Sequence, residues 1–186
     1  MFRFRRTRLT LAATGLLALL AWLAWLRLEP FDHVAAGHWR RQLEEAPAGQ
    51  VELLADRLAQ LGAPGVRALV NAMGSQREVV ASASRRVLWA ELGRWETLPV
   101  PAITSNLAVL AESLSRNAKG FGPAARRDAT DLATEILLWL PDAGATNRVD
   151  IIGHCDRVFE CAAVDQSAVA SIAAAASRAR DALVRE

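Results

Sequence analysis

Several residue types are scarce in this chain of 186 residues. Its two cysteines, Cys155 and Cys161, are too few to staple a disulfide-rich mini-domain. Glycine (11) and proline (7) are also few, and Ala and Leu dominate over the β-branched and aromatic residues, which favours helices. Tyrosine is absent and Lys119 is the only lysine among 22 basic residues, a bias typical of a GC-rich bacterial genome. We therefore do not interpret the arginines as a nucleic-acid-binding signature.

Acidic residues are missing from the first 28 positions, which hold five arginines: Arg3, Arg5, Arg6, Arg8 and Arg27. The other 17 basic residues therefore face all 20 acidic residues, so the rest of the chain is mildly acidic in spite of the overall charge of +2. A protein that binds phosphate backbones by counterion release needs a basic surface. The folded part lacks that charge, and we expect no nucleic-acid partner.

A predominantly apolar run of twenty residues, 9–28, contains a single charge, Arg27, next to its end. A helix of this length is about 30 Å long, which matches the hydrocarbon core of a bilayer. Tryptophan and arginine near the end of such a run favour the headgroup region. We expect a transmembrane signal-anchor helix whose positions include Leu9, Leu16, Leu20, Trp22, Trp25 and Leu28.

The charge asymmetry around this run predicts its orientation. Four arginines precede it, so the positive-inside rule places residues 1–8 in the cytoplasm as a basic tail and everything after Pro30 across the membrane. A cleaved secretory signal is the alternative, because small residues near Ala36 suit a signal peptidase, although the run exceeds the usual apolar core of about 7 to 15 residues. Both interpretations place the folded region on the periplasmic or extracytoplasmic side.

Apolar residues beyond Phe31 recur with helical spacing, and no alternating run of β-branched residues indicates a strand. The sequence predicts an all-α fold with helices near residues 35–46, 50–62, 65–73, 76–95, 102–118, 122–140, 147–162 and 166–185. Glycines and prolines separate most of these segments. The tetrapeptide Ser-Gln-Arg-Glu at 75–78 has the form of a capping box and predicts a helix with Ser75 as its N-cap.

The spacing also predicts which side chains are buried. The helix at 76–95 is expected to bury the stripe Val80, Ala83, Val87 and Ala90, and the helix at 147–162 the stripe Val149, Ile152, Cys155, Phe159 and Ala162. Three tryptophans, Trp89, Trp95 and Trp139, are expected in the core. Trp39 follows the membrane span closely and is expected at the membrane interface.

The chain resembles itself at an offset of 41 residues. This offset superimposes apolar positions and an Ala-x-Arg-Arg tetrapeptide: Val66, Leu69, Val70, Met73, Ala83, Arg85 and Arg86 fall on Leu107, Leu110, Ala111, Leu114, Ala124, Arg126 and Arg127. A second step places Leu110, Ala111 and Leu114 on Ile151, Ile152 and Cys155. The period lies in the range of HEAT and armadillo units, and the sequence predicts a repeat.

The segment from Leu58 to Leu88 resembles a bacterial HEAT repeat. It has the Leu-Gly stop, the x-Pro-x-Val-x-x-Leu-Val first helix, a short polar turn and a second helix of the form Val-x-x-Ala-small-x-x-Val-Leu. It departs from the family at Gly74-Ser75, where an aspartate is usual, and at Ala81, where an arginine commonly forms a ladder between repeats. The resemblance implies a short α-solenoid of antiparallel helix pairs and a binding role, not a reaction.

Two groups of residues are candidates for chemistry. His154 and Cys161 lie seven apart on one helix face and suit a soft metal, but no further ligand pattern accompanies them, so we expect no metal. Cys155 is expected to be a small core residue. Asp128, Asp131 and Glu135 share a helix face and are expected to be solvated. No catalytic, cofactor or small-molecule site is predicted.

The arginine pairs suggest a surface for a protein partner. Arg85, Arg86, Arg126 and Arg127 recur at the repeat period and are expected to line one face, where they either grip an acidic partner or pair with neighbouring acids. We expect a non-enzymatic scaffold: a basic tail (1–8), a membrane anchor (9–28), a juxtamembrane linker or helix (29–49) and a HEAT-like domain (50–186) that binds an unidentified protein. The alternatives are an exported soluble helical protein and a metal-dependent factor.

Overall fold

The computed structural model describes residues 34–140 and 145–163, and these residues form helices with short connections and no strand. The helices are residues 34–45, α2 (Ala48–Ala59), α3 (Ala63–Met73), α4 (Glu78–Trp95), α5 (Val100–Asn117), the 3₁₀ turn η1 (Ala118–Gly120), α6 (Pro123–Leu138) and α7 (Ala145–Ala163). The prediction of an all-α protein is confirmed for this part of the chain. The predicted anchor at 9–28 and the predicted helix at 166–185 lie outside the described residues.

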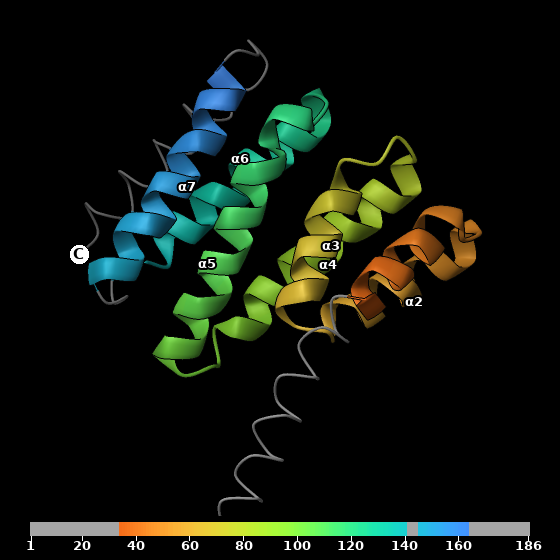
Figure 1. Cartoon of the computed structure of the whole chain (residues 1–186), viewed down its shortest axis with the longest axis horizontal. Helices are drawn as coiled ribbons and strands as arrows, with labels where there is room; N and C mark the ends of the chain where they lie inside the picture. The colour runs from red at the N-terminus through yellow and green to blue at the C-terminus, as the bar shows by residue number, and fades with distance from the viewer. Residues whose placement is uncertain (1–33, 141–144, 164–186) are drawn as a thin grey trace, which may run out of the picture.

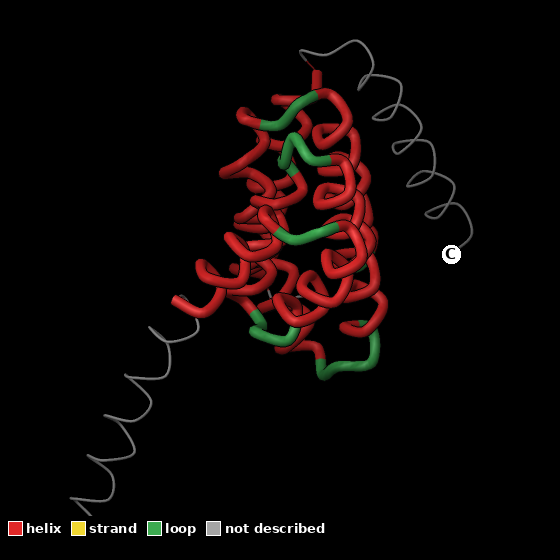
Figure 2. Tube along the Cα trace, turned by 90° about the vertical axis from the view of Figure 1, so that its right-hand side faces the viewer, coloured by secondary structure: helices red, strands yellow, loops and turns green. Residues whose placement is uncertain are grey.

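The helices form two layers (Figures 1 and 2). α3, α5 and α7 follow one another in the first layer, where α5 packs between α3 and α7. α2, α4 and α6 belong to the second layer, and each packs against a helix of the first. Connections of two to five residues join the helices up to α6, so consecutive helices run antiparallel.

Residues 34–45 belong to the packed body. Leu43 is fully buried and Ala36 is 4% exposed. The Glu44 carboxylate accepts a hydrogen bond from Ser75, and the Arg77 guanidinium donates to the main-chain oxygens of Glu44 and Ala46. The core therefore begins before residue 50. Within residues 34–140 and 145–163, no helix has the length and apolar character needed to cross a bilayer.

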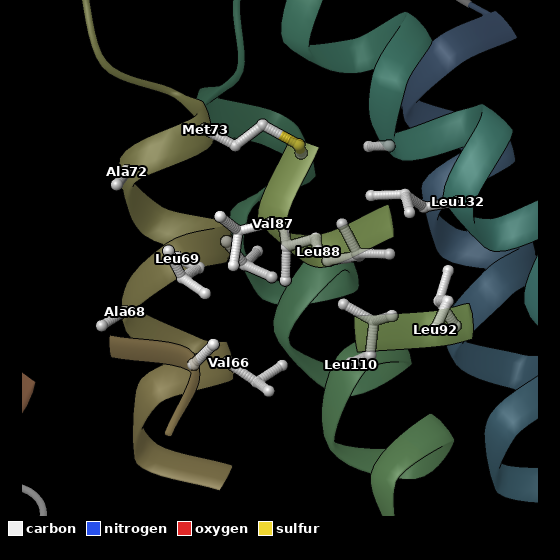
Figure 3. Packing of buried hydrophobic residues seen from close by; sticks show 14 of the residues in the cluster. Val66, Ala68, Leu69, Ala72, Met73, Val87, Leu88, Leu92, Leu110 and Leu132 are labelled. Atoms are coloured by element: carbon white, nitrogen blue, oxygen red, sulfur yellow. The ribbon is translucent and has the colours of Figure 1, made fainter. Parts of the chain in front are cut away.

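The interior is filled by leucine, valine and alanine from both layers. Figure 3 shows Leu69 of α3, Leu88 of α4 and Leu110 of α5 in the same packed region. All eight residues that the 41-residue offset aligns between α3 and α5 are buried: Val66, Leu69, Val70, Met73, Leu107, Leu110, Ala111 and Leu114. In α7, Ile151 and Cys155 continue this buried stripe, whereas Ile152 is 36% exposed. Each full burial of such a side chain contributes roughly 1.5–3 kcal/mol.

The predicted capping box is wrong in its register. α4 begins at Glu78, and its N-cap, Arg77, makes no side-chain capping hydrogen bond. The Ser75 hydroxyl instead accepts the main-chain N–H of Arg77, two residues along, and donates to Glu44. Ser75 therefore closes a local turn that docks on the first helix, a contact 31 residues away that the tetrapeptide does not encode.

Parts of the predicted stripes are also wrong. Ala90 is exposed, and so are Val149 (70%) and Ile152. Trp95 is buried as expected, but Trp89 is 37% exposed on the outside of α4. Trp39 packs partly buried against the core, and its expected position at a membrane interface stays a prediction. A helix in a two-layer stack touches neighbours on two or three sides, so spacing alone locates its buried face less well.

The crossing of α2 and α3 depends on two glycines. Gly62 has φ +63°, a conformation that favours glycine. Gly65 packs directly on α2: a Cβ there would lie 1.7 Å from the carbonyl oxygen of Leu58. The Gly-Ala-Pro-Gly segment, interpreted from sequence as a helix breaker, therefore contains the first turn of α3 and a close contact with α2.

Candidate functional site

Arg85 joins α4 to α6. Its Nη1 donates to both carboxylate oxygens of Asp128, at 3.0 and 2.8 Å. The pair is partly shielded, since the Asp128 side chain is only 20% exposed. Charge-assisted contacts to both oxygens favour a single geometry. Asp128, expected from sequence to be solvated, therefore braces successive helices of one layer.

Arg86, the next residue, points to the other neighbour in the layer. It donates to Glu52 of α2, and both side chains are more than half exposed. The hydrogen bond and charge of Arg86 lower the pKa of Glu52. An ion pair this exposed is screened by water and salt and exchanges readily for another partner. The two adjacent arginines thus brace α4 on both sides.

The second arginine pair lies differently. Arg127 of α6 is exposed, and no ion pair of its side chain occurs within the described part of the chain. Arg126 is half-buried, and its Nε has no hydrogen-bond partner there. Ala124, aligned with buried Ala83, is exposed. The structure therefore brings Arg85 and Arg86 together with acids of adjacent helices and gives Arg126 and Arg127 other surroundings.

The outer face of α4 presents a strip of mixed polar and apolar residues that the sequence patterns did not indicate as a surface. Val79, Ser82, Arg86, Trp89 and Gly93 recur at steps of three and four and define what we call the α4 outer face. Val79 and Trp89 are 36% and 37% exposed. A Cβ at Gly93 would meet nothing within 4 Å, so packing within the described chain gives no reason for a glycine inside this helix. The period of this strip was visible in the sequence, but the tryptophan was assigned to the core.

A polar cluster connects α5 and α7. Arg157 donates through Nε to the Ser115 hydroxyl (3.1 Å) and through Nη2 to His154 Nδ1 (2.6 Å). His154 Nδ1 also lies 3.3 Å from the Ser115 hydroxyl. Burial and the Arg157 charge lower the pKa of His154, which favours the neutral ring with its proton on Nε2. Because its Nδ1 lone pair accepts from arginine, His154 is badly placed to activate Ser115 as a nucleophile.

His154, one of the two residues considered from sequence as metal ligands, belongs to this polar cluster. Within the described residues no group of three His, Cys, Asp or Glu side chains is placed to hold a metal. The guanidinium beside His154 disfavours a cation at that nitrogen. Cys155 is fully buried, as expected of a core residue, and burial raises the pKa of its thiol to about 12. Cys161 is partly buried and lies against the core.

A shallow groove of about 430 Å³ marks the N-terminal end of the stack. The first helix and α2 line it with one aromatic, several polar and a few aliphatic side chains: Trp39, Gln42, Glu45, Ala46, Gln50, Leu53, Leu54 and Arg57. The Arg57 guanidinium lies 5.4 Å from the centre of the Trp39 ring, within cation–π range. Leu53 is 56% exposed at this end.

Comparison of the chain with protein-family models, with curated protein sequences and with solved structures finds no significant match.

Proposed function

We propose that the protein is a membrane-anchored, non-enzymatic scaffold whose HEAT-like helix stack binds another protein outside the cytoplasm. The observation that carries the proposal is the α4 outer face. Trp89 and Val79 are each more than a third exposed there, and Arg86 lies between them in an exposed ion pair. Partly exposed tryptophan and arginine are the residue types most enriched at binding hot spots.

The arrangement of helices supports the solenoid interpretation. Short connections join antiparallel pairs, and the 41-residue offset relates buried positions of α3 and α5, which lie side by side. Arg85 and Arg86 tie three helices of one layer by ion pairs, a role comparable to the ladder that the sequence lacks at Ala81. Stacked pairs leave an extended outer face, which suits docking of a partner.

Burial of Ala36 supports an intact anchor over the cleaved alternative. Cleavage after Ala36 would remove the start of the first described helix together with a side chain that is 4% exposed. An uncleaved span at 9–28 keeps that helix whole. A periplasm-active reporter fused after Glu186 should be active and a cytoplasm-active reporter inactive; the opposite result would exclude the proposed orientation.

The metal-dependent alternative has little support, since Nδ1 of His154 contacts Arg157 and Ser115. Metal analysis tests the metal-dependent alternative directly. Metal analysis of the purified full-length protein is expected to find no stoichiometric zinc, iron or copper. One equivalent of metal that is lost in the His154→Ala variant would establish this alternative and contradict our proposal.

Photo-crosslinking in intact cells tests the docking surface. Benzoylphenylalanine at Gly93 of the α4 outer face should yield a discrete crosslinked partner, whereas the same probe at Ser105, exposed on α5 in the other layer, should not. Adding Trp89→Ala should reduce the Gly93 product strongly, because truncating a hot-spot tryptophan costs at least about 2 kcal/mol, roughly 30-fold in Kd. Equal products from positions 93 and 105, or none from either, would refute the surface.

A further inference from the structure

We propose that the N-terminal end of the helix stack rests on the phospholipid surface of the membrane that holds the anchor. The contact face consists of Trp39, Gln50, Leu53 and Arg57, which we call the end face. This inference rests on the proposed anchor and adds an orientation: the stack stands on the bilayer with its N-terminal groove against the headgroups.

The end face is the side of the first helix pair that the rest of the stack leaves open. Glu44 and Glu52 mark a different side, because they bind Ser75 and Arg86 of the next helix pair. Leu53 follows Glu52, about 100° further round α2, and is 56% exposed. Within residues 34–140 and 145–163, the residues that line the groove come from the first helix and α2.

The length of chain before the stack limits how far this face lies from the bilayer. Five residues, 29–33, separate the end of the apolar run from the first described residue, Val34. Even fully extended, this length of chain spans only about 20 Å. The headgroup region itself extends roughly 5–7 Å beyond the hydrocarbon core. The first helix pair is therefore held within reach of the headgroups.

The chemistry of the end face suits an anionic lipid surface. An indole with an apolar body, an exposed leucine and an arginine stem are the groups that favour the membrane–water interface. The groove itself holds one arginine, Arg57, and one acid, Glu45, while Arg40 and Arg41 are exposed elsewhere on the first helix. Each arginine near an anionic bilayer contributes about 1 kcal/mol, roughly five-fold in the docked population.

A second copy of the chain is the competing occupant. The groove is lined by Gln42, Glu45, Gln50 and Arg57 in addition to its apolar groups, a polar composition suited to a capping repeat. An apolar core large enough for a stable dimer is not present in that lining. A bilayer tolerates these groups, since their polar ends stay in the headgroup layer.

This orientation would set the height of the α4 outer face. Neighbouring packed helices lie about 8–10 Å apart, so α4, in the second helix pair, would stand roughly 10–20 Å above the headgroups with its outer face directed sideways. A partner would then reach Trp89 from the side, close to the membrane.

The test uses the full-length protein in vesicles of equal parts phosphatidylethanolamine and phosphatidylglycerol with a fluorescent phospholipid. Benzoylphenylalanine is placed in turn at Leu20 of the anchor, Leu53 of the end face and Ser105 of α5. Leu53 and Ser105 are both exposed, so neither probe disturbs the core. We expect lipid crosslinking from the probe at Leu20. Lipid crosslinking from the probe at Leu53 should be at least about five-fold greater than from the probe at Ser105, the increase in the docked population that one arginine contributes. Arg57→Gln should lower the value at 53.

The outcomes separate the two proposals. Without lipid crosslinking at Leu20 the anchor fails, and this inference fails with it. Labelling at Leu20 with equal, low labelling at Leu53 and Ser105 overturns the orientation and leaves the anchor standing. A protein dimer as the main product at Leu53 identifies a second copy as the occupant and also overturns the inference. A probe at Gln50, exposed on the same face, must repeat the result at Leu53.

Discussion

Replacing Gly65 with alanine should separate α2 from α3. The new Cβ would lie 1.7 Å from the carbonyl oxygen and 2.7 Å from the carbonyl carbon of Leu58, both main-chain atoms. Reaching even 3.0 Å requires the two helices to move apart by about 1.3 Å. A gap of roughly 0.5–1 Å already forfeits a quarter to a half of the dispersion energy at a contact. Overpacking costs about 1–3 kcal/mol, and contact with rigid backbone lies at the upper end.

Gly93→Ala is the matched control, because its Cβ meets nothing within 4 Å. Alanine stabilises a helix interior over glycine by about 0.5–1 kcal/mol. In thermal unfolding of the full-length protein in mild detergent, followed by circular dichroism, Gly65→Ala should lower the Tm by roughly 4–10 °C and Gly93→Ala should raise it by about 1–4 °C. A Gly65→Ala protein as stable as the Gly93→Ala protein would refute the close crossing.

Three further outcomes are expected. In a urea titration, Arg85→Gln should lower the free energy of unfolding by about 1 kcal/mol, because it leaves the shielded Asp128 carboxylate unpaired. Arg86→Gln should change the free energy of unfolding very little, because its ion pair is exposed. Burial and the Arg157 charge lower the pKa of His154, so its folded form binds a proton less readily than the unfolded chain. The contribution of His154 to the free energy of unfolding is therefore complete at pH values above its ordinary pKa of 6.5 and is lost as the pH falls below that value. His154→Gln should flatten the dependence of the urea midpoint on pH in that range, and an unchanged pH dependence would contradict this. With a thiol reagent near pH 8, mass spectrometry should detect modification of Cys161 before Cys155, whose thiol has a pKa of about 12, and equal rates would argue against its burial.

Helix positions were largely predictable because they depend on local patterns. Pro64, Pro101 and Pro123 each lie in the first turn of a helix, where proline is tolerated, and the predicted helix starts lie within a few residues of those observed. The apolar positions of α3 that the 41-residue offset aligns are all buried, and this helix packs on both α4 and α5. Local spacing wrongly predicted Ser75 as a helix N-cap, because its hydrogen-bond partner Glu44 comes from a helix 31 residues away.

The candidate surfaces were less predictable. The recurrence of arginine pairs was visible in the sequence, but their partners Glu52 and Asp128 lie 34 and 43 residues away. Trp89 was assigned to the core because it follows an apolar stripe, yet it lies on the outer side of α4. Composition and period identify residues that face the same side of one helix, but not which side its neighbours cover.

Residue spacing and turn residues are enough to predict that this chain forms helices, where most of them begin and end, and that α3 and α5 carry equivalent apolar positions. The tertiary structure alone decided that Gly65 is a helix contact, that Arg85 and Arg86 brace opposite neighbours, and that Trp89 and Leu53 are left outside. Those outcomes depend on which helix faces meet, and distant segments supply the meeting face.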